Sequence, residues 1–167
     1  MKLIWTKSNK PLSILIRWGL NEPVSHFAIV FDNFLVFQSN LLGVSLTVYS
    51  EFLKHCEVVY SVDVELPLQE EEAVYKSIIP LFIGRAYDWK AFAYFCYRGF
   101  LQKAFGIPIP KVSPFDTNSN KTEICVELVK ALPEWMVPPS LHSADLSIIS
   151  PYTVYLEFKA FYSEAPK

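Results

Sequence analysis

The segment between residues 121 and 133 constrains this chain more than any other, because it combines a helix pattern with a reactive side chain. Residues 115–120 before it are rich in Asp, Asn and Ser, which is typical of turns. Thr122 is the predicted N-cap, and Pro133 ends the helix because proline has no backbone N–H to donate. Cys125 then falls in the first turn, where backbone N–H groups and the helix dipole favour a thiolate. The pattern predicts a cysteine nucleophile with a lowered pKa.

A second interpretation of Cys125 fits the same segment. The cysteine lies at helical spacing from Leu128, Val129 and Leu132, so it also has the position of a small apolar core residue. The rest of the chain has to distinguish the two interpretations.

Size and composition limit the classes to which the protein can belong. A chain of 167 residues predicts a single domain over residues 1–167, and 51% hydrophobic residues predict that it folds. A net charge of −2 and the lack of a basic run argue against a nucleic-acid partner. The three cysteines are widely spaced and form no CxxC pair. We therefore expect no metal site, no cofactor, no disulfide framework and a reducing compartment.

The apolar segments of the chain are short or interrupted. Residues 1–11 contain no apolar stretch of the length found in signal peptides. Residues 86–105 are strongly apolar but are interrupted by four charged side chains, which makes them a poor membrane span. These patterns predict no signal peptide, no transmembrane segment and a cytoplasmic or phage virion-associated location.

The order of the predicted elements indicates an α+β fold. A short edge strand is expected over residues 2–6, further strands over 25–31, 34–39, 43–48, 57–64 and 152–158, and helices over 50–54, after Pro67 and over 89–105. Residues 12–18 form an apolar run that fits either type. Aromatic side chains nearly encircle residues 89–105, which predicts a core helix; a lipid-facing or partner-facing surface is the alternative.

A cysteine nucleophile needs a base, and His26 is the best placed of the three histidines because it opens an apolar strand. A hairpin turning at Asp32 and Asn33 would place Gln38 on the neighbouring strand and on the same face, where its amide would hold the imidazole in one tautomer. The plainer interpretations are a strand-end histidine bonded to a backbone carbonyl and a glutamine that faces solvent.

Four segments in this order resemble the permuted NlpC/P60 papain-like hydrolases, the YiiX/YaeF-like group, in which the histidine strand precedes the cysteine helix. Residues 16–19 with 25–30 resemble the "IRW … SHxxI" opening of that family. Residues 36–39 with 43–44 resemble its "VxEA … GV" segment, residues 83–89 its "GxxYDW" turn, and residues 124–129 its "CSEL" nucleophile helix.

The resemblance implies a permuted papain-like fold, with an antiparallel sheet packed against the nucleophile helix. It implies a cysteine hydrolase that acts on an amide or ester bond of a small peptide, acyl or cell-wall-derived substrate, without a cofactor. By the same resemblance, Cys125 is the nucleophile, His26 the base, Gln38 the orienting residue and Tyr87 a side chain near the oxyanion position.

Two departures from the family pattern keep other functions open. Val126 stands where the family usually has Ser, and Gln38 stands where an acidic residue is frequent. The second hypothesis is therefore a weak or inactive member that serves as a binding or virion-associated module. The third is a lipid-surface enzyme, and in both of these residues 87–105 would contact lipid or protein.

Overall fold

The computed structural model describes residues 1–106, 122–123 and 125–164. Its centre is a five-stranded antiparallel sheet with the strand order β4-β3-β2-β1-β5. These strands are β1 (Lys2–Lys7), β2 (His26–Val30), β3 (Leu35–Asn40), β4 (Gly43–Val48) and β5 (Glu57–Asp63). A small parallel pair joins β6 (Ala86–Tyr87) to β7 (Thr122–Glu123). The expected α+β class and the first five expected strands are confirmed, but the edge position expected for residues 2–6 is wrong, because β1 pairs with β2 on one side and β5 on the other.

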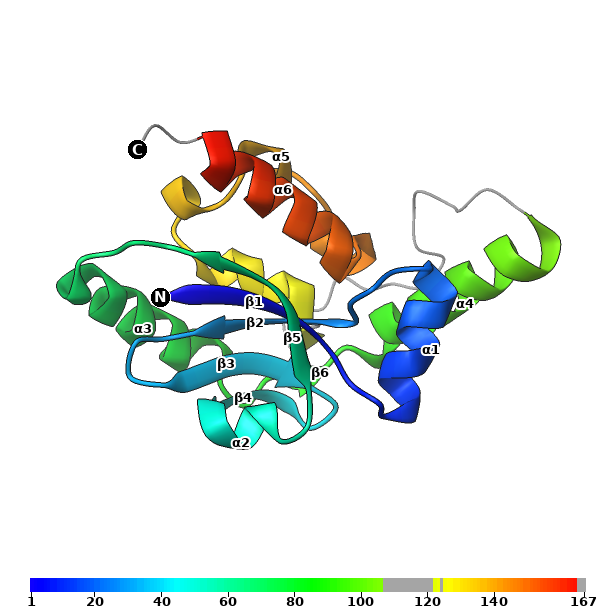
Figure 1. Ribbon diagram of the computed structural model, residues 1–167, viewed down its shortest axis with the longest axis horizontal. Helices are drawn as coiled ribbons and strands as arrows, with labels where there is room; N and C mark the ends of the chain where they lie inside the picture. The colour runs from blue at the N-terminus through cyan, green and yellow to red at the C-terminus, as the bar shows by residue number, and fades with distance from the viewer. Residues whose placement is uncertain (107–121, 124, 165–167) are drawn as a thin grey trace.

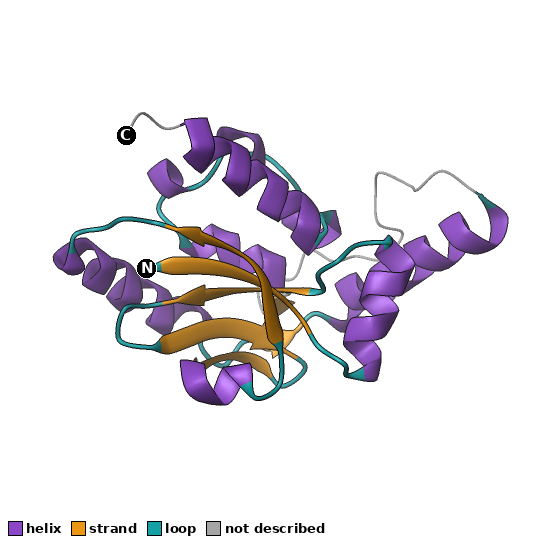
Figure 2. Ribbon diagram, in the orientation of Figure 1, coloured by secondary structure: helices purple, strands orange, loops and turns teal. Residues whose placement is uncertain are grey.

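Helices cover the sheet and extend beyond it. They are α1 (Pro11–Leu20), α2 (Tyr49–Leu53), α3 (Leu68–Phe82), α4 (Trp89–Phe105), α5 (Pro139–His142) and α6 (Pro151–Glu164), with the 3₁₀ helices η1 (Cys125–Ala131), η2 (Glu134–Met136) and η3 (Leu146–Ile148). Figure 1 shows α6 above the sheet, α3 at its left, and α1 with α4 projecting together at its right. Figure 2 shows the same division between the strands and the surrounding helices.

The two faces of the sheet carry cores of different size. Alternate side chains of a strand point to opposite faces, so Phe27 and Ile29 of β2 enter the large core with η1 and α6. Ala28 and Val30 enter a smaller core, closed by Phe52 of α2. The face on which a strand residue lies therefore decides which core it joins.

The β2–β3 hairpin sets the register of the candidate site. Phe34 has a φ of 61°, so the chain turns through a left-handed residue without a glycine. Gln38 pairs with Ala28 across the two strands. His26, two residues from Ala28, is then a diagonal neighbour of Gln38 on the same face.

The strand expected at residues 152–158 is wrong: this segment lies in α6. Ser150 caps the helix, since its Oγ accepts the Thr153 N–H at 3.1 Å, and Pro151 occupies the first turn. Val154, Tyr155 and Phe158 recur at helical spacing and are buried. The β-branched and aromatic content that predicted a strand was outweighed by the cap and by this spacing.

The helix expected from Thr122 onwards starts later and has a different form. Thr122 lies in β7, where pairing with Ala86 keeps the chain extended. The helix begins at Cys125 and is a 3₁₀ helix of seven residues. Its dipole is correspondingly short, which weakens the reason for a lowered thiol pKa. The turn expected at 115–120 lies outside the described residues.

The expectation that residues 89–105 form a core helix is also wrong. Tyr94 and Phe95 are buried, and Phe92 is half-buried. However, the exposed fraction is 53% for Trp89, 41% for Tyr97, 53% for Phe100 and 63% for Phe105. One side of α4 packs against α1 and the rest of the protein, while the other side faces solvent.

A glycine contact explains how α1 approaches α4 so closely. A Cβ added at Gly99 would lie 2.4 Å from the Cα of Gly19, nearer than any real Cβ contact. A Cβ added at Gly19 would lie 3.6 Å from the Cα of Gly99, which is ordinary contact. The close crossing therefore requires glycine at position 99. We call this pair of helices, α1 with α4, the arm.

Candidate functional site

His26 and Gln38 form the hydrogen bond that the sequence predicted. His26 Nε2 and Gln38 Oε1 are 3.2 Å apart, and Gln38 Nε2 donates to Thr47 Oγ1 at 3.1 Å. Because the Gln38 amide donates to Thr47, its oxygen faces the ring and Nε2 carries the imidazole proton. Nδ1 is then the ring atom with a lone pair for a proton.

Burial keeps the His26 ring neutral. It lowers the pKa of His26 to about 4, although the hydrogen bond to Gln38 acts in the opposite direction. The ring also packs 6.3 Å, centre to centre, from Phe52 of α2. At neutral pH the imidazole can accept a proton, as a general base must.

Cys125 does not have the pKa that the helix pattern predicted. Burial raises the pKa of the thiol to about 11, against the opposing effect of the backbone N–H groups of Phe27, Val126 and Cys125 itself. The predicted low pKa is therefore wrong, because desolvation of the buried sulfur outweighs the nearby donors. In the resting protein Cys125 is a thiol.

The structure places Cys125 next to the His26 strand but on the other side of it. The sulfur lies near the N–H of Phe27, the residue that follows His26. The Phe27 side chain shares the large core with Cys125, whereas His26 points toward α2. Among the hydrogen bonds of the described residues, none joins the thiol to the imidazole.

Tyr87 lies beside the thiol, as expected from the resemblance. Burial raises the pKa of the Tyr87 hydroxyl, and the neighbouring Cys125 adds to this effect. Both residues border a cavity of about 20 Å³, room for one water-sized group. The cavity is lined by Ile16, Leu20, Ser25, Tyr87, Phe92, Phe95, Cys125, Val126 and Pro151. The inner side of the arm thus forms much of the wall next to the sulfur.

Thr47 is a site residue that the sequence analysis missed. It orients Gln38 in the way that Gln38 orients His26. The sequence contains a signal for this role, because Ser45 and Thr47 alternate with apolar residues along β4. In the structure Gln38 pairs with Ser45. A polar residue two positions from that pair lies on the same face.

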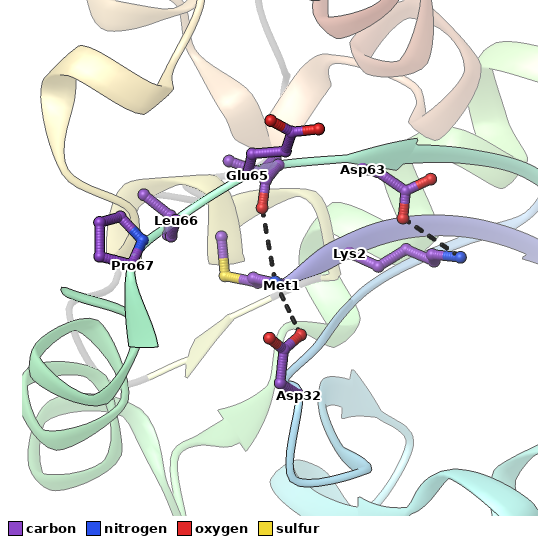
Figure 3. A pocket seen from close by; sticks show the side chains of 8 residues that line it. Met1, Lys2, Asp32, Asp63, Glu65, Leu66 and Pro67 are labelled. Carbon is purple, nitrogen blue, oxygen red and sulfur yellow. Dashed lines mark hydrogen bonds and ion pairs between the residues drawn. The ribbon is translucent and has the colours of Figure 1, made fainter. Parts of the chain in front are cut away.

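A larger hollow of about 470 Å³ lies beside the N-terminus and is shown in Figure 3. The Met1 ammonium lies 2.9 Å from Asp32 Oδ1 and 2.8 Å from Glu71 Oε2. At its rim, Lys2 Nζ lies 3.2 Å from Asp63 Oδ1. These charges pair with one another and include no nucleophile with a base, so the chemistry points to the small cavity.

The other features of the described residues offer no competing centre. His142 Nε2 lies near the carbonyls of Glu134 and Val137 at 3.1 and 3.0 Å, which is a structural role. No cluster of three His, Cys, Asp or Glu side chains in the described ranges is suited to hold a metal ion. Among the helices of those ranges, none has both the length and the apolar character needed to cross a bilayer.

Comparisons of the chain with models of protein families, with curated proteins and with solved structures found no match.

Proposed function

We propose that the protein is a cysteine hydrolase with a permuted papain-like arrangement, in which Cys125 attacks an amide or ester carbonyl. The observation that carries this proposal is the chain of hydrogen bonds from Thr47 through Gln38 to His26, at the end of the strand against which the Cys125 sulfur lies. Polar chains that hold an imidazole in one tautomer are what a general base requires.

In the proposed reaction the proton leaves the thiol as the sulfur–carbon bond forms. Burial raises the pKa of the Cys125 thiol and lowers that of the His26 imidazole. At rest the two groups are therefore a neutral thiol and a neutral imidazole, not a thiolate and an imidazolium. His26 Nδ1 takes the proton and returns it to the departing amine or alcohol, and water then hydrolyses the acyl-sulfur bond. This step requires the thiol and the ring to come together around the end of β2 when substrate enters.

The surroundings of Cys125 fit the remaining needs of acyl transfer. The N–H groups of Phe27, Cys125 and Val126 converge near the sulfur, where the oxyanion of a tetrahedral intermediate would form. Tyr87 borders the same cavity. The apolar lining from α1 and α4 favours an apolar group beside the scissile bond.

The test is turnover of p-nitrophenyl esters and p-nitroanilides of short and long acyl groups. Cys125→Ala should lower the rate by about a thousandfold or more. Cys56→Ala is the matched control, since burial raises its thiol pKa to about 11 as well, and it should keep the wild-type rate. His26→Asn should also lower kcat, and mass spectrometry should find the acyl group on Cys125. Unchanged turnover in Cys125→Ala, or an acyl group on another residue, would contradict the proposal.

A second candidate, a non-catalytic binding module, is favoured by a different observation. The outer side of α4 exposes Trp89, Tyr97 and Phe100, which a purely catalytic domain does not need. If no acyl substrate is turned over while the arm binds a partner, this second function replaces the first.

A further inference from the structure

Both helices of the arm turn apolar stripes toward solvent. On α1 the exposed residues are Pro11, Ile14, Leu15 and Trp18, which recur at spacings of three and four. On α4 the exposed stripe follows the same spacing and comprises Trp89, Ala93, Tyr97, Phe100 and Ala104. In an ordinary surface helix these positions are polar.

One contact joins a lysine next to the α4 stripe to the α1 stripe. Lys103, one turn beyond Phe100, places its Nζ 4.6 Å from the centre of the Trp18 ring. The close Gly19–Gly99 crossing holds the helices together behind this contact. The arm therefore presents one apolar surface, built from two helices that project from the sheet (Figure 1).

Charge is distributed unevenly between the arm and the rest of the chain. The two helices hold four of the 15 Lys and Arg residues and none of the 17 Asp and Glu residues. Lys90 and Lys103 of α4 are exposed, as is Lys10 at the start of α1. The remainder of the chain, which we call the body, has 11 basic and 17 acidic residues. A cationic arm therefore extends from an anionic body.

We propose that the outer side of the arm docks onto the surface of an anionic lipid bilayer. Trp and Tyr rings prefer the headgroup level of a bilayer, and lysine stems lie along apolar surface while their ammonium groups reach anionic phosphates. A second copy of the chain fits less well, since pairing two arms would bring like charges together.

This inference goes beyond the proposed function and holds with or without catalysis. It also names the partner that a binding module would have. Its failure is separable from failure of the hydrolase, because vesicle binding is measured on the Cys125→Ala protein as well and should be unchanged there. The anionic body keeps the rest of the molecule off the surface, so docking orients the protein with the arm toward the lipid.

The experiment is flotation of the full chain with vesicles of phosphatidylcholine alone or with about 30% phosphatidylglycerol, a content that gives a strongly negative surface. The wild type should float with the anionic vesicles only, and about 0.5 M salt should weaken this binding. Lys90→Glu with Lys103→Glu should reduce binding about tenfold or more. Trp18→Ser with Phe100→Ser should reduce it comparably.

Matched controls come from the body of the protein. Lys54→Glu with Lys76→Glu reverses two lysines that are also exposed, and Phe34→Ser removes an exposed aromatic ring outside the arm. These variants should bind as the wild type does, and circular dichroism should show that all variants fold. Absence of binding to anionic vesicles, or equal loss in the control variants, would overturn the proposal. A concentration-dependent dimer that the Trp18→Ser, Phe100→Ser variant abolishes, without vesicle binding, would also overturn it.

Discussion

Helices α4 and α6 are both rich in aromatic residues, yet they serve opposite purposes. In α6 the side chains of Tyr155 and Phe158 are buried against Trp5 of β1, with ring centres 5.3 and 5.9 Å away. In α4 the rings of Trp89 and Phe100 are more than half exposed. The same class of residue builds the core in one helix and the surface in the other.

The two helices differ in the element that packs against them. The α6 helix lies along β1 and β5 and faces a wide sheet, which receives several rings at once. Among the described residues, the α4 helix packs mainly against the narrow α1 helix and against η3, and a helix pair in glycine contact buries few large side chains. A helix rich in aromatic residues is therefore expected to make apolar contacts. The elements packed against it determine whether those contacts lie inside the protein.

The largest predicted effect is a difference in the free energy of unfolding between a variant of α6 and a variant of α4. Phe158→Ala leaves a cavity among Trp5, Phe27 and Tyr162, and should lower the free energy of unfolding by about 3–5 kcal/mol. Phe100→Ala on α4 should change it by only about 0.5 kcal/mol. Urea denaturation of both variants measures the contrast, and equal losses would show that the α4 rings are packed in solution.

Acid should weaken the body but leave the arm intact. Unfolded His26 gains a proton below about pH 6.5, whereas folded His26 gains one only below about pH 4. The unfolded state binds more protons between these values, so stability falls as the pH falls through this window, by about 3 kcal/mol. The loss should be smaller in His26→Asn, which does not titrate there.

The arm serves as the internal reference for this measurement, because α1 and α4 contain no Asp, Glu or His. Contacts between α1 and α4 should depend on pH less than those of the sheet; the pH dependence expected there comes from Glu22, whose pKa is raised by burial and which interacts with Arg98 of α4. Hydrogen exchange at sheet amides and at α4 amides, followed from pH 7 to pH 4, distinguishes the two regions. A loss of protection that begins in α4 would contradict the expectation.

The addition of one methyl group at the α1–α4 crossing should move the two helices apart. Gly99→Ala drives a Cβ into the backbone of Gly19 and should cost about 1–3 kcal/mol as the helices move apart. Gly19→Ala places its Cβ at ordinary contact distance and should be neutral or slightly stabilising. Thermal unfolding of the two variants checks this asymmetry; a reversed order would mean that the helices cross differently.

The smallest effects concern the caps at the starts of the two helices. Asp88 accepts the N–H groups of Lys90 and Ala91 at 2.9 and 3.0 Å, and Ser150 accepts that of Thr153. Asp88→Ala and Ser150→Ala should each cost about 1 kcal/mol. Asp88→Asn and Ser150→Thr retain an acceptor and should recover most of the loss. If neither of these two conservative variants recovers the lost stability, the capping side chains stabilise the protein through other contacts.

The sequence by itself determined the antiparallel sheet and the His26–Gln38 pair. Both depend on local information: runs of β-branched residues, a turn of known length, and the alternation of side chains along a strand. Once the hairpin turns near Asp32, the register follows within a residue, and the two polar side chains share a face.

Only the tertiary structure decided the state of Cys125 and the roles of α4 and α6. The thiol pKa depends on how deeply distant segments bury the sulfur, and that desolvation exceeded the effect of the local N–H groups. Residues 152–158 and 89–105 carry similar patterns of aromatic residues. The first became a core helix because a sheet received its rings, and the second an exposed arm because, among the described residues, no sheet covers its outer side. Burial is a property of the space between segments far apart in the chain, so local patterns do not encode it.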